Sequence, residues 1–599
     1  MKLRGVVWWA GVGLAAMAAQ GVNAAVFDVN AKGVMRRWDL VNPASHVPVN
    51  APIHVSTNAV NPATKAIRYC LASDAFSATN RLAELDAVRA SFAIWQSVPD
   101  TILKFEEGGL VASPGGQFDE TDGTNVVFWI RDTSLLGDTV DPTSMLGLTY
   151  LATADNVMVG ADIVLNGEAF YGPRWFTRYD QPPADTRYHF VEAIVTHEIG
   201  HVIGLEHSPA GGSTLFHRDF AGLGTYLGLS ADDRLGVQVL YPRDGWAAMR
   251  GRITGTVKMG GAGVLGAIVC AEDAAGNLAG VTLSRASGAY ELPGLLPGTY
   301  QVRVSPLDPS SDTSVFLVRG VDLYDAVYAD AEAFFEPVAG TVTVTAGGTR
   351  TADWVVTASG SPLRVVGIRR ATASLTHGYV ANQTARIVVG QSNYYAGVFA
   401  DWIPADATLE VTGDGITYQA LGIATASGYP LIYGQISVSS NATPGLRTFV
   451  LRGAGHVAYA NGFLEVLPAV VDINGDGLED AFQRRYFSPW TRIEAGPGMD
   501  PDGDGFSNGY EHLAESDPSL ATSLPVVEIE SATVTVEGTT IRWRSVPGGE
   551  YQVYARDAFH PSTPWQPIGG RVTSSGATAE HRDTAATQHL RFYRVLAYP

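Results

Sequence analysis

The spacing of apolar residues predicts two helices in the first 245 residues of the chain. Residues 83–96 carry an apolar stripe at helical spacing, formed by Leu85, Val88, Phe92 and Trp95. Such a stripe is typical of an amphipathic helix with one face toward a core. Residues 190–203 show the same spacing, and the expected buried face consists of Val191, Ile194, Val195, Val202 and Ile203.

Shorter apolar runs predict strands around these helices and throughout the rest of the chain. Residues 125–130 and 145–152 have the length and composition of strands. From Arg252 onward the sequence consists of short runs of alternating apolar and polar residues separated by glycines. Similar runs continue to the C-terminus. The pattern therefore predicts a multidomain chain, with an α/β (α+β) domain followed by mainly all-β sandwich domains.

The N-terminus has the pattern of a secretory signal peptide over residues 1–25. Lys2 and Arg4 precede an apolar run at residues 6–19, and residues 22–24 supply small side chains at the expected cleavage site. The alternative is a retained membrane anchor, although the run is shorter than the roughly 20 residues that span a bilayer. We therefore expect a secreted, extracellular protein without a transmembrane segment, or one held at the cell surface.

Composition narrows the class of protein further. A chain of 599 residues is too long for one core, and 46% apolar residues indicate folded domains. The formal net charge of −20 argues against nucleic acid as a partner, because phosphate binding needs clustered Lys and Arg. The two cysteines, Cys70 and Cys270, fall in different predicted domains, and the apolar strand around Cys270 favours a buried free thiol.

The strongest chemical signal is the run from His197 to His207. His197 and His201 are four residues apart on the predicted helix, so both imidazoles can reach one metal ion. Gly204 tolerates the backbone conformation of a chain reversal, which would return His207 as a third ligand. Three imidazoles leave one tetrahedral position of Zn²⁺ open, as in catalytic sites. Glu198 could then serve as general base toward a water at that position.

The pattern His-Glu-x-x-His-x-x-Gly-x-x-His is the metzincin signature, and Ser208 directly after it resembles the matrixin branch, the matrix metalloproteinase-like peptidases. Three further segments resemble parts of a matrixin catalytic domain: residues 85–105, 161–166 and 229–242. The resemblance implies a zinc-dependent endopeptidase domain over residues 26–245, with a twisted mixed sheet and an active-site helix. It also implies one catalytic zinc per chain and a protein or peptide substrate.

The sequence departs from the family at two positions near the third histidine. Metzincins place a methionine in a tight turn beneath the zinc, and Leu215 stands at that position here. Leucine has a similar volume, and such swaps cost less than about 1.5 kcal/mol, so we expect a working site with altered metal tuning. His217 stands where matrixins usually carry proline. It is interpreted either as a polar assistant in the transition state or as a surface turn residue.

Analogy with matrixins also suggests how substrate binds. Residues 146–150 are expected to form an edge strand that pairs with an extended peptide. Residues 220–227 would form the wall of the pocket for the substrate residue after the scissile bond. Cys70 lacks the surrounding sequence of a matrixin propeptide cysteine, and the ligands of a second, structural zinc are not evident.

Three β-rich segments follow the peptidase domain. Residues 249–358 resemble a β-sandwich of the carboxypeptidase-regulatory type, and residues 361–468 have the regular turn signals of an immunoglobulin-like sandwich. Residues 524–599 resemble a fibronectin-like domain. No catalytic constellation is evident in these segments, so we expect a scaffold or spacer role, or binding of matrix, polysaccharide or a cell surface.

Residues 470–520 hold a second chemical signal, two loops of the EF-hand type that resemble the dockerin-like calcium repeats of secreted bacterial proteins. The later loop offers the full ligand pattern in Asp500, Asp502, Asp504, the carbonyl of Phe506, Asn508 and Glu511. The earlier loop begins in the same way with Asp472, Asn474, Asp476 and Asp480. Gln483 replaces its bidentate glutamate. We expect structural Ca²⁺ here, and an acidic turn without metal is the alternative.

Two classes of function therefore stand against each other. One is a secreted zinc endopeptidase, favoured by the intact histidines and Glu198. The other is an adhesive or matrix-binding protein with a vestigial peptidase domain, suggested by Leu215 and by the long β-rich appendage.

Overall fold

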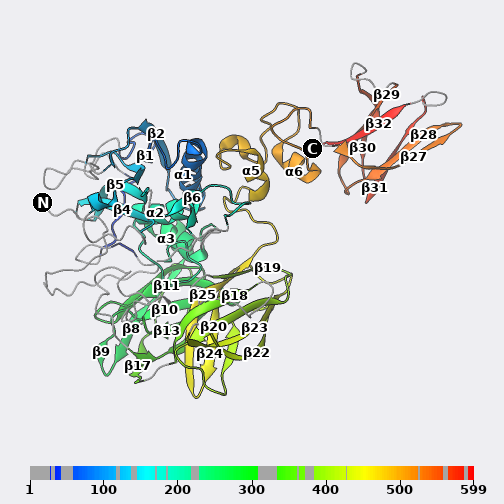
Figure 1. Cartoon of the computed structure of the whole chain (residues 1–599). Helices are drawn as coiled ribbons and strands as arrows, with labels where there is room; N and C mark the ends of the chain where they lie inside the picture. The colour runs from blue at the N-terminus through cyan, green and yellow to red at the C-terminus, as the bar shows by residue number, and fades with distance from the viewer. Residues whose placement is uncertain are drawn as a thin grey trace. The chain divides into compact units, whose positions relative to one another are not determined.

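The computed structural model describes sixteen stretches of the chain, residues 27–28, 34–41, 59–115, 122–136, 145–154, 156–168, 172–183, 187–216, 228–307, 334–360, 363–371, 384–426, 428–523, 526–557, 564–585 and 591–598. They fall into two compact units, Met1–Ile473 and Asn474–Pro599 (Figure 1). The expected signal peptide at residues 1–25 lies outside the described residues. Within them, no helix is both long and apolar enough to cross a membrane.

The first unit begins with a five-stranded mixed sheet in the order β2-β1-β3-β5-β4. Its strands are β1 (Ile67–Ala72), β2 (Phe105–Val111), β3 (Val126–Ile130), β4 (Gly147–Ala154) and β5 (Val157–Asn166). Four strands run parallel, and β4 lies antiparallel to β5 at one edge. Every residue of β3 is buried, as expected of a central strand covered on both faces. The mixed sheet and the two predicted strands are confirmed.

Three helices accompany this sheet: α1 (Arg81–Gln96), α2 (Val191–Val202) and α3 (Ala231–Leu240). Helices α1 and α2 were predicted from the apolar spacing, and the expected apolar stripe of α1 is buried. Helix α3 lies within residues 229–242, a segment that resembles part of a matrixin domain. Helix α3 begins with a capping box between Ser230 and Asp233. Smaller elements complete this part: η3 (Thr133–Leu136), β6 (Arg174–Phe176), β7 (Tyr188–Phe190) and α4 (Trp246–Met249).

Helix α2 is held in place by hydrogen bonds to its backbone carbonyls. The indole of Trp95, on α1, donates to the carbonyl of Thr196 at 2.8 Å. At the C-terminal end, the indole of Trp38 donates to the carbonyl of Val202 at 2.8 Å. Such bonds satisfy buried polar groups and fix the helix against its surroundings. Because α2 carries the candidate ligands, its position determines theirs.

The next part of the first unit consists of ten strands in two sheets, ordered β11-β10-β13-β15 and β12-β8-β17-β14, with β9 and β16 pairing with β8. The strands are β8 (Gly251–Met259), β9 (Ala262–Gly263), β10 (Ile268–Glu272), β11 (Leu278–Leu283), β12 (Ala289–Leu295), β13 (Gly298–Ser305), β14 (Phe335–Glu336), β15 (Val338–Val344), β16 (Thr349–Thr351) and β17 (Trp354–Ala358). Cys270 is buried on β10 and Cys70 is partly exposed on β1. Both are free thiols, as predicted for Cys270.

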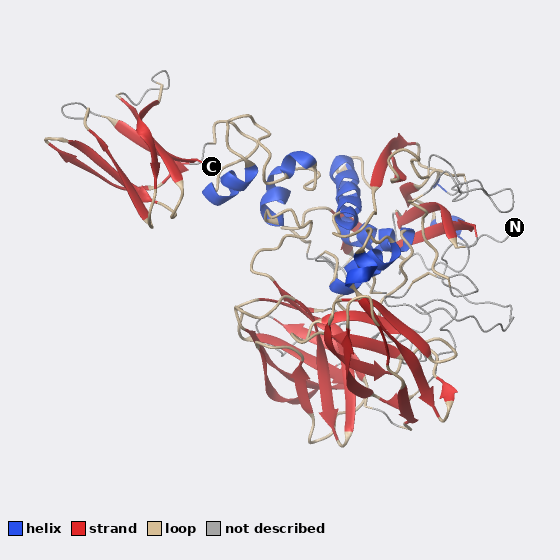
Figure 2. Ribbon diagram, turned by 180° about the vertical axis from the view of Figure 1, so that it is seen from behind, coloured by secondary structure: helices blue, strands red, loops and turns tan. Residues whose placement is uncertain are grey.

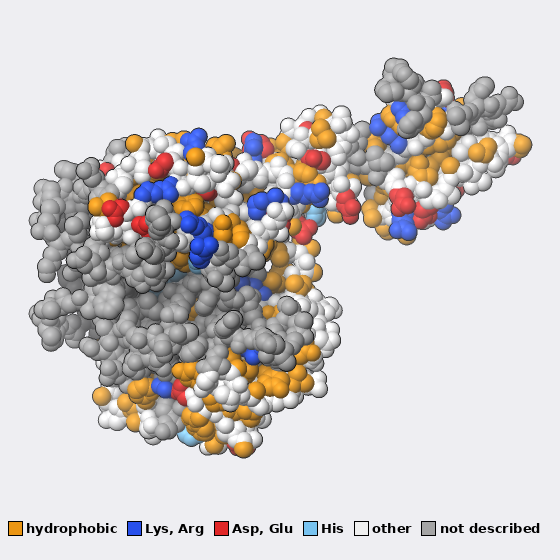
Figure 3. All heavy atoms as spheres, in the orientation of Figure 1, with side chains coloured by type: hydrophobic (Ala, Val, Ile, Leu, Met, Phe, Trp, Pro, Cys, Tyr) orange, Lys and Arg blue, Asp and Glu red, His pale blue; other side chains and the backbone are white. Residues whose placement is uncertain are grey.

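Eight further strands form two four-stranded sheets, ordered β18-β20-β23-β22 and β19-β25-β24-β21. They are β18 (Val365–Ala371), β19 (Ala385–Val388), β20 (Tyr394–Ala400), β21 (Thr408–Val411), β22 (Ile416–Ala426), β23 (Tyr429–Val438), β24 (Gly445–Gly453) and β25 (His456–Leu467). Figure 2 shows that the helices of the first unit lie near the mixed sheet and that the rest of this unit is built of strands. On the edge strand β22, Leu421 and Ile423 are exposed, and Figure 3 shows hydrophobic side chains at the surface of this β-rich part.

The second unit combines short helices with seven strands. Its elements are α5 (Asp480–Tyr486), η6 (Ile493–Ala495), α6 (Asn508–Ala514), β26 (Val526–Val527), β27 (Ile529–Thr535), β28 (Gly538–Arg544), β29 (Glu550–Arg556), β30 (Gln566–Thr573), β31 (Thr578–Asp583) and β32 (Phe592–Tyr598). The strands form sheets in the orders β26-β32-β29-β30 and β27-β28-β31 around buried Trp543 and Val553. The mainly β composition after the first domain is thus confirmed, and the exact domain boundaries stay predictions.

Candidate active site

The end of helix α2 makes the chain reversal that the sequence predicts. The helix ends at Val202, and Gly204 adopts a left-handed backbone with φ of 99°. A side chain at Gly204 would also be blocked, because a Cβ there would lie 2.4 Å from the carbonyl oxygen of Arg36. Glycine is therefore required by conformation and by space. The reversal carries the chain back toward the helix at His207.

The three histidines of the motif converge. Their ring centroids lie 4.9 Å apart for His197 and His201, 5.2 Å for His197 and His207, and 4.9 Å for His201 and His207. One nitrogen from each ring lies within 4.8 Å of the others, so a single ion can contact all three. His201 and His207 are buried and His197 is half-buried. The reversal thus brings together ligands that the sequence separates by up to ten positions.

Backbone carbonyls determine which ring nitrogens face the centre. Nδ1 of His197 lies 2.8 Å from the carbonyl oxygen of Thr214, and Nδ1 of His201 lies 2.8 Å from that of Leu205. A carbonyl can only accept, so each Nδ1 carries the proton and each Nε2 presents a lone pair in the neutral ring.

The arrangement of these lone pairs favours a cation between the rings. The Nε2 atoms of His197 and His201 lie 3.2 Å apart, and two lone pairs facing each other at that distance repel. Burial lowers the pKa of His201 well below its usual value, with His197 and His207 contributing, so protonation of His201 does not relieve the repulsion. A metal ion between the rings does, and Nδ1–H bonds to carbonyls are the usual support of such ligands. The donor set fits Zn²⁺.

Glu198 lies buried between α2 and the edge strand β4. Its Oε2 accepts a hydrogen bond of 2.7 Å from the hydroxyl of Thr149, which also lies 3.1 Å from the Glu198 carbonyl oxygen. Room for the other oxygen is made by Gly147, where a Cβ would lie 2.6 Å from Oε1. Burial raises the pKa of Glu198, against lowering contributions from His197 and Thr149. Sequence analysis missed Thr149 and Gly147, which carry no local signal of this contact.

Residues 208–216, here named the ligand loop, lie against the histidines. Leu215 is 1% exposed, and a Cβ on Gly200 of α2 would lie 2.5 Å from its Cδ2. Leu215 therefore packs directly under the active-site helix, as expected for the position of the metzincin methionine. His217 and the expected pocket wall at residues 220–227 lie outside the described residues.

Two neighbouring carboxylates of α3 hold the ligand loop. Asp233 accepts hydrogen bonds from the Ser213 hydroxyl at 2.5 Å and from the Thr214 amide at 2.9 Å. Asp232 accepts one of 2.7 Å from the hydroxyl of Ser208. Burial and the adjacent charge of Asp233 raise the pKa of Asp232 to about 7. Neither carboxylate was recognised from the sequence, which marks them only as residues at the start of a helix.

A second cluster that could hold a metal, among the described residues, lies in the second unit. Carboxylate oxygens of Asp500, Asp502 and Asp504 lie within 4.8 Å of one another. Asn508 and Glu511 are fully buried beside them. The structure thus brings together the three aspartates expected in the later calcium loop, and the Phe506 carbonyl and Asn508 stay predicted ligands.

Several oxygens of this loop have no hydrogen-bond partner among the described residues: Asp502 Oδ2, Asp504 Oδ2, Asn508 Oδ1 and Glu511 Oε2. The amide nitrogen of Asn508 donates to two carbonyls, of Glu494 at 2.8 Å and Gly496 at 2.9 Å, which turns its oxygen the other way. Burial, with the nearby aspartates, raises the pKa of Glu511 to about 7. Buried acceptors without donors are costly unless a cation neutralises them.

In the earlier loop, a carboxylate oxygen is hydrogen-bonded by side-chain amides of the same loop. The amide nitrogen of Gln483 donates to Asp476 Oδ2 at 2.8 Å and to the Ala495 carbonyl at 2.9 Å. Asn474 also donates to Asp476 Oδ2, at 3.2 Å. Amide hydrogens therefore occupy a position where a calcium loop would offer oxygen. Asp472 belongs to the end of the first unit and Asp480 begins α5.

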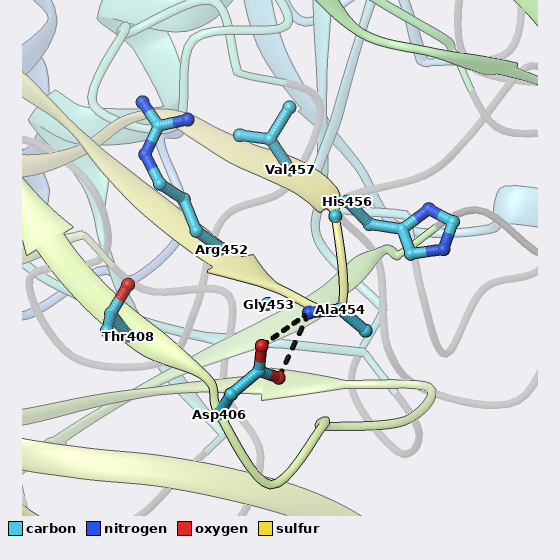
Figure 4. A pocket seen from close by; sticks show the side chains of 8 residues that line it. Asp406, Thr408, Arg452, Gly453, Ala454, His456 and Val457 are labelled. Carbon is cyan, nitrogen blue, oxygen red and sulfur yellow. Dashed lines mark hydrogen bonds between the residues drawn. The ribbon is translucent and has the colours of Figure 1, made fainter.

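A separate pocket of about 400 Å³ lies at the β24–β25 hairpin (Figure 4). Its carboxylate, Asp406, accepts two hydrogen bonds from the amide of Ala454, at 3.0 and 3.1 Å. Its imidazole, His456, lies with Nδ1 2.9 Å from Oε1 of Glu336. Asp406 thus bonds to the hairpin turn and His456 contacts Glu336 of β14, so neither side chain is assigned a catalytic role.

Comparison with known families identifies the domain that carries the histidines. Residues 62–242 match the matrixin family model, inside the predicted domain of residues 26–245. This part of the chain is a matrixin domain. Matrixins are zinc metalloendopeptidases, so the matrixin domain makes this chain a hydrolase of peptide bonds. The three converging histidines are the donors available for its zinc.

Comparisons with whole proteins add no argument beyond the matrixin domain. No curated protein matches the chain. A candidate carbohydrate-binding protein from Bacteroides uniformis is 12% identical, covers 35% of this chain and 96% of its own, and has a TM-score of 0.12. The major pilin subunit BcpA of Bacillus cereus is 10% identical, covers 58% of this chain and 88% of its own, and has a TM-score of 0.14. Scores this low establish no shared fold.

Proposed function

We propose that this chain is a secreted endopeptidase that hydrolyses extracellular proteins at a zinc held by His197, His201 and His207, with Glu198 as general base. The observation that carries the proposal is the pair of Nε2 atoms 3.2 Å apart, both with their lone pairs toward one centre. Bound zinc would supply Lewis acidity at the scissile carbonyl and a nucleophilic water at neutral pH. The apolar N-terminal run supports secretion.

Glu198 is the residue assigned to proton transfer. It follows His197 directly on α2, and its carboxylate is fixed by the Thr149 hydroxyl at 2.7 Å. A held carboxylate can take the proton of an attacking water and deliver it to the leaving amine. Thr149 is a positioning residue, because it acts through the carboxylate rather than on the substrate.

Substrate would bind along β4. This strand lies at the edge of the mixed sheet, and no strand of the described residues pairs with its second side, where an extended peptide could bind. Thr149 and Gly147 belong to the same strand and contact Glu198. A peptide paired with β4 would therefore lie next to the proposed base. The same strand would then bind the substrate and position Glu198.

We further propose structural Ca²⁺ in the loop of residues 500–511. Four ligand oxygens there are buried and have no hydrogen-bond partner among the described residues, and their positions match the EF-hand spacing. The loop of residues 472–483 is the weaker candidate, since the Gln483 amide donates to Asp476. Bound calcium would stabilise the loop and the adjacent helix α6.

The experiment that tests the catalytic proposal separates zinc binding from proton transfer. In Glu198→Ala, the three histidines remain, so zinc content should equal that of the parent. Cleavage of an unstructured protein should fall by about 10²–10⁴-fold, as for loss of a general base. Full activity with zinc still bound would exclude Glu198 as the base. Loss of zinc would show instead that Glu198 has a structural role.

A further inference from the structure

Besides its hydrogen bonds to α3, the ligand loop makes tertiary contacts outside the matrixin domain. Ala210 is fully buried in a cluster with Cys270 and Leu278 of the first β-rich part and Leu446 of the second. Phe216 is 2% exposed and belongs to the core of the second β-rich part, the strands β18 to β25. The two ends of the loop are thus embedded in cores that the matrixin domain does not itself supply.

Backbone hydrogen bonds fix the middle of the loop to the same sandwich. The amide of Gly211 donates to the carbonyl of Asn461 at 2.9 Å. The hydroxyl of Thr384 donates to the carbonyl of Gly211 at 2.6 Å. The amide and the carbonyl of Gly211 are therefore both held by this sandwich, the amide by Asn461 of β25 and the carbonyl by Thr384, which directly precedes β19. A loop anchored on both sides of one residue has little freedom to shift.

The approach is close enough to require glycine. A Cβ on Gly211 would lie 2.5 Å from the ring of Phe463, and a Cβ on Gly212 would lie 2.3 Å from Leu446 Cδ2. Contacts under 3.0 Å demand displacement of a buried neighbour. Phe463 also packs edge-on against Phe216, with centroids 5.4 Å apart at 85°. Phe463 therefore contacts the loop at two points.

The anchored loop in turn holds a zinc ligand. The carbonyl of Thr214 accepts the Nδ1–H of His197 at 2.8 Å, and the carbonyl of Leu215 accepts the amide of Ser208 at 2.8 Å. Displacing Thr214 would remove the bond that orients the His197 ring and selects its tautomer. The path from Phe463 to His197 contains only Phe216, Leu215 and Thr214.

We propose that the β-sandwich of strands β18–β25 positions the zinc ligand His197, with Phe463 and Thr384 as positioning residues that act through the ligand loop. The sandwich is then part of the metal site rather than a spacer behind it. This inference concerns the affinity for zinc and does not depend on the role of Glu198.

The test measures zinc affinity of the full chain by competition with a chromogenic chelator, alongside thermal unfolding of the zinc-free protein. Phe463→Ala removes the contact with the loop. Phe399→Ala is the matched control, because Phe399 is equally buried in the same sandwich but belongs to a separate cluster with Val366 and Leu431. Both variants should unfold at lower temperature than the parent.

Zinc affinity should separate the two variants. Phe463→Ala should bind zinc about 10-fold or more weakly, as expected when the support of a ligand is lost, whereas Phe399→Ala should bind like the parent. Phe463→Leu should recover part of the affinity. Equal affinity in Phe463→Ala and the parent would overturn the proposal, as would equal losses in Phe463→Ala and Phe399→Ala.

A milder variant covers the case in which Phe463→Ala does not fold. Thr384→Val keeps the volume and removes the hydroxyl that donates to Gly211. We expect a loss of zinc affinity of about 5-fold, the equivalent of one hydrogen bond. Parent-like zinc affinity in folded Thr384→Val would overturn the proposal.

Discussion

The carbonyl oxygen of Thr214 lies 2.8 Å from Nδ1 of His197, and this contact links a loop to a metal ligand. The residue after Thr214 is Leu215, at the position of the metzincin methionine. The packing of Leu215 under α2 and the orientation of His197 are therefore properties of one short segment. An apolar side chain of suitable volume maintains that segment whether it carries sulfur or not.

The first prediction concerns this position. Leu215→Met should change the unfolding free energy by less than about 1.5 kcal/mol, because the two side chains have similar volume. Zinc affinity should stay within about 10-fold of the parent. Leu215→Ala, the comparison, should lose about 2–5 kcal/mol through the cavity it leaves. If Leu215→Met raised zinc affinity by several orders of magnitude, leucine could not be regarded as equivalent to methionine beneath the zinc ligands.

A second prediction uses the space beside Glu198. A Cβ at Gly147 would lie 2.6 Å from Oε1, so Gly147→Ala should displace the carboxylate and lower kcat by about 10-fold or more with zinc content unchanged. Gly570→Ala is the matched control, since a Cβ there meets nothing within 4 Å. Equal kcat in the parent and Gly147→Ala, from steady-state kinetics, would show that the carboxylate tolerates the shift.

The third prediction is a pH dependence of stability. The pKa of Asp232 rises from 3.8 to about 7 through burial and the charge of Asp233. Between these pH values the folded state binds more protons than the unfolded state, so this residue makes stability fall as pH rises. The decline should total on the order of 4 kcal/mol and level off above about pH 7.

The variant that checks this dependence is Asp232→Asn, which resembles the protonated form. Its side-chain oxygen can still accept from the Val281 amide, as Oδ1 of Asp232 does at 3.0 Å. Urea unfolding at pH 5 and pH 8 should show a smaller loss in the variant than in the parent. Identical losses in both proteins would mean that Asp232 is ionised throughout.

The fourth prediction concerns calcium. Glu511→Gln removes the buried carboxylate expected to bind Ca²⁺ through two oxygens, so the dissociation constant should rise by about 10-fold or more. Glu515→Gln makes the same change at the exposed end of helix α6 and should bind like the parent. Isothermal titration with Ca²⁺ distinguishes them. No calcium binding by the parent would exclude the site.

Local patterns made much of the fold predictable. The apolar spacing of residues 83–96 and 190–203 gave helices α1 and α2, because a helical stripe is written within one segment. The histidines could be assigned to one metal because two are four residues apart and Gly204 permits the reversal. The ligand positions at residues 500–511 follow from a spacing that is local in the same way.

Contacts between distant segments were not predictable. Thr149 supports Glu198 from 49 positions away, and Thr384 holds Gly211 from 173 positions away. Neither threonine stands out in its own strand or loop. The expectation that the β-rich parts act as scaffold or spacer rested on the absence of catalytic motifs, which says nothing about packing. Phe216 belongs to the core of a sandwich more than 140 residues further along the chain.

The central claim is tested most directly by the zinc content of the purified full chain and its cleavage of an unstructured protein, with and without a zinc-selective chelator. Calcium is kept in excess, so that the chelator acts on zinc alone. The account predicts one zinc per chain and cleavage that stops when zinc is removed and returns when it is restored. Stoichiometric zinc without cleavage would favour a vestigial peptidase domain, and cleavage that survives zinc removal would contradict the account.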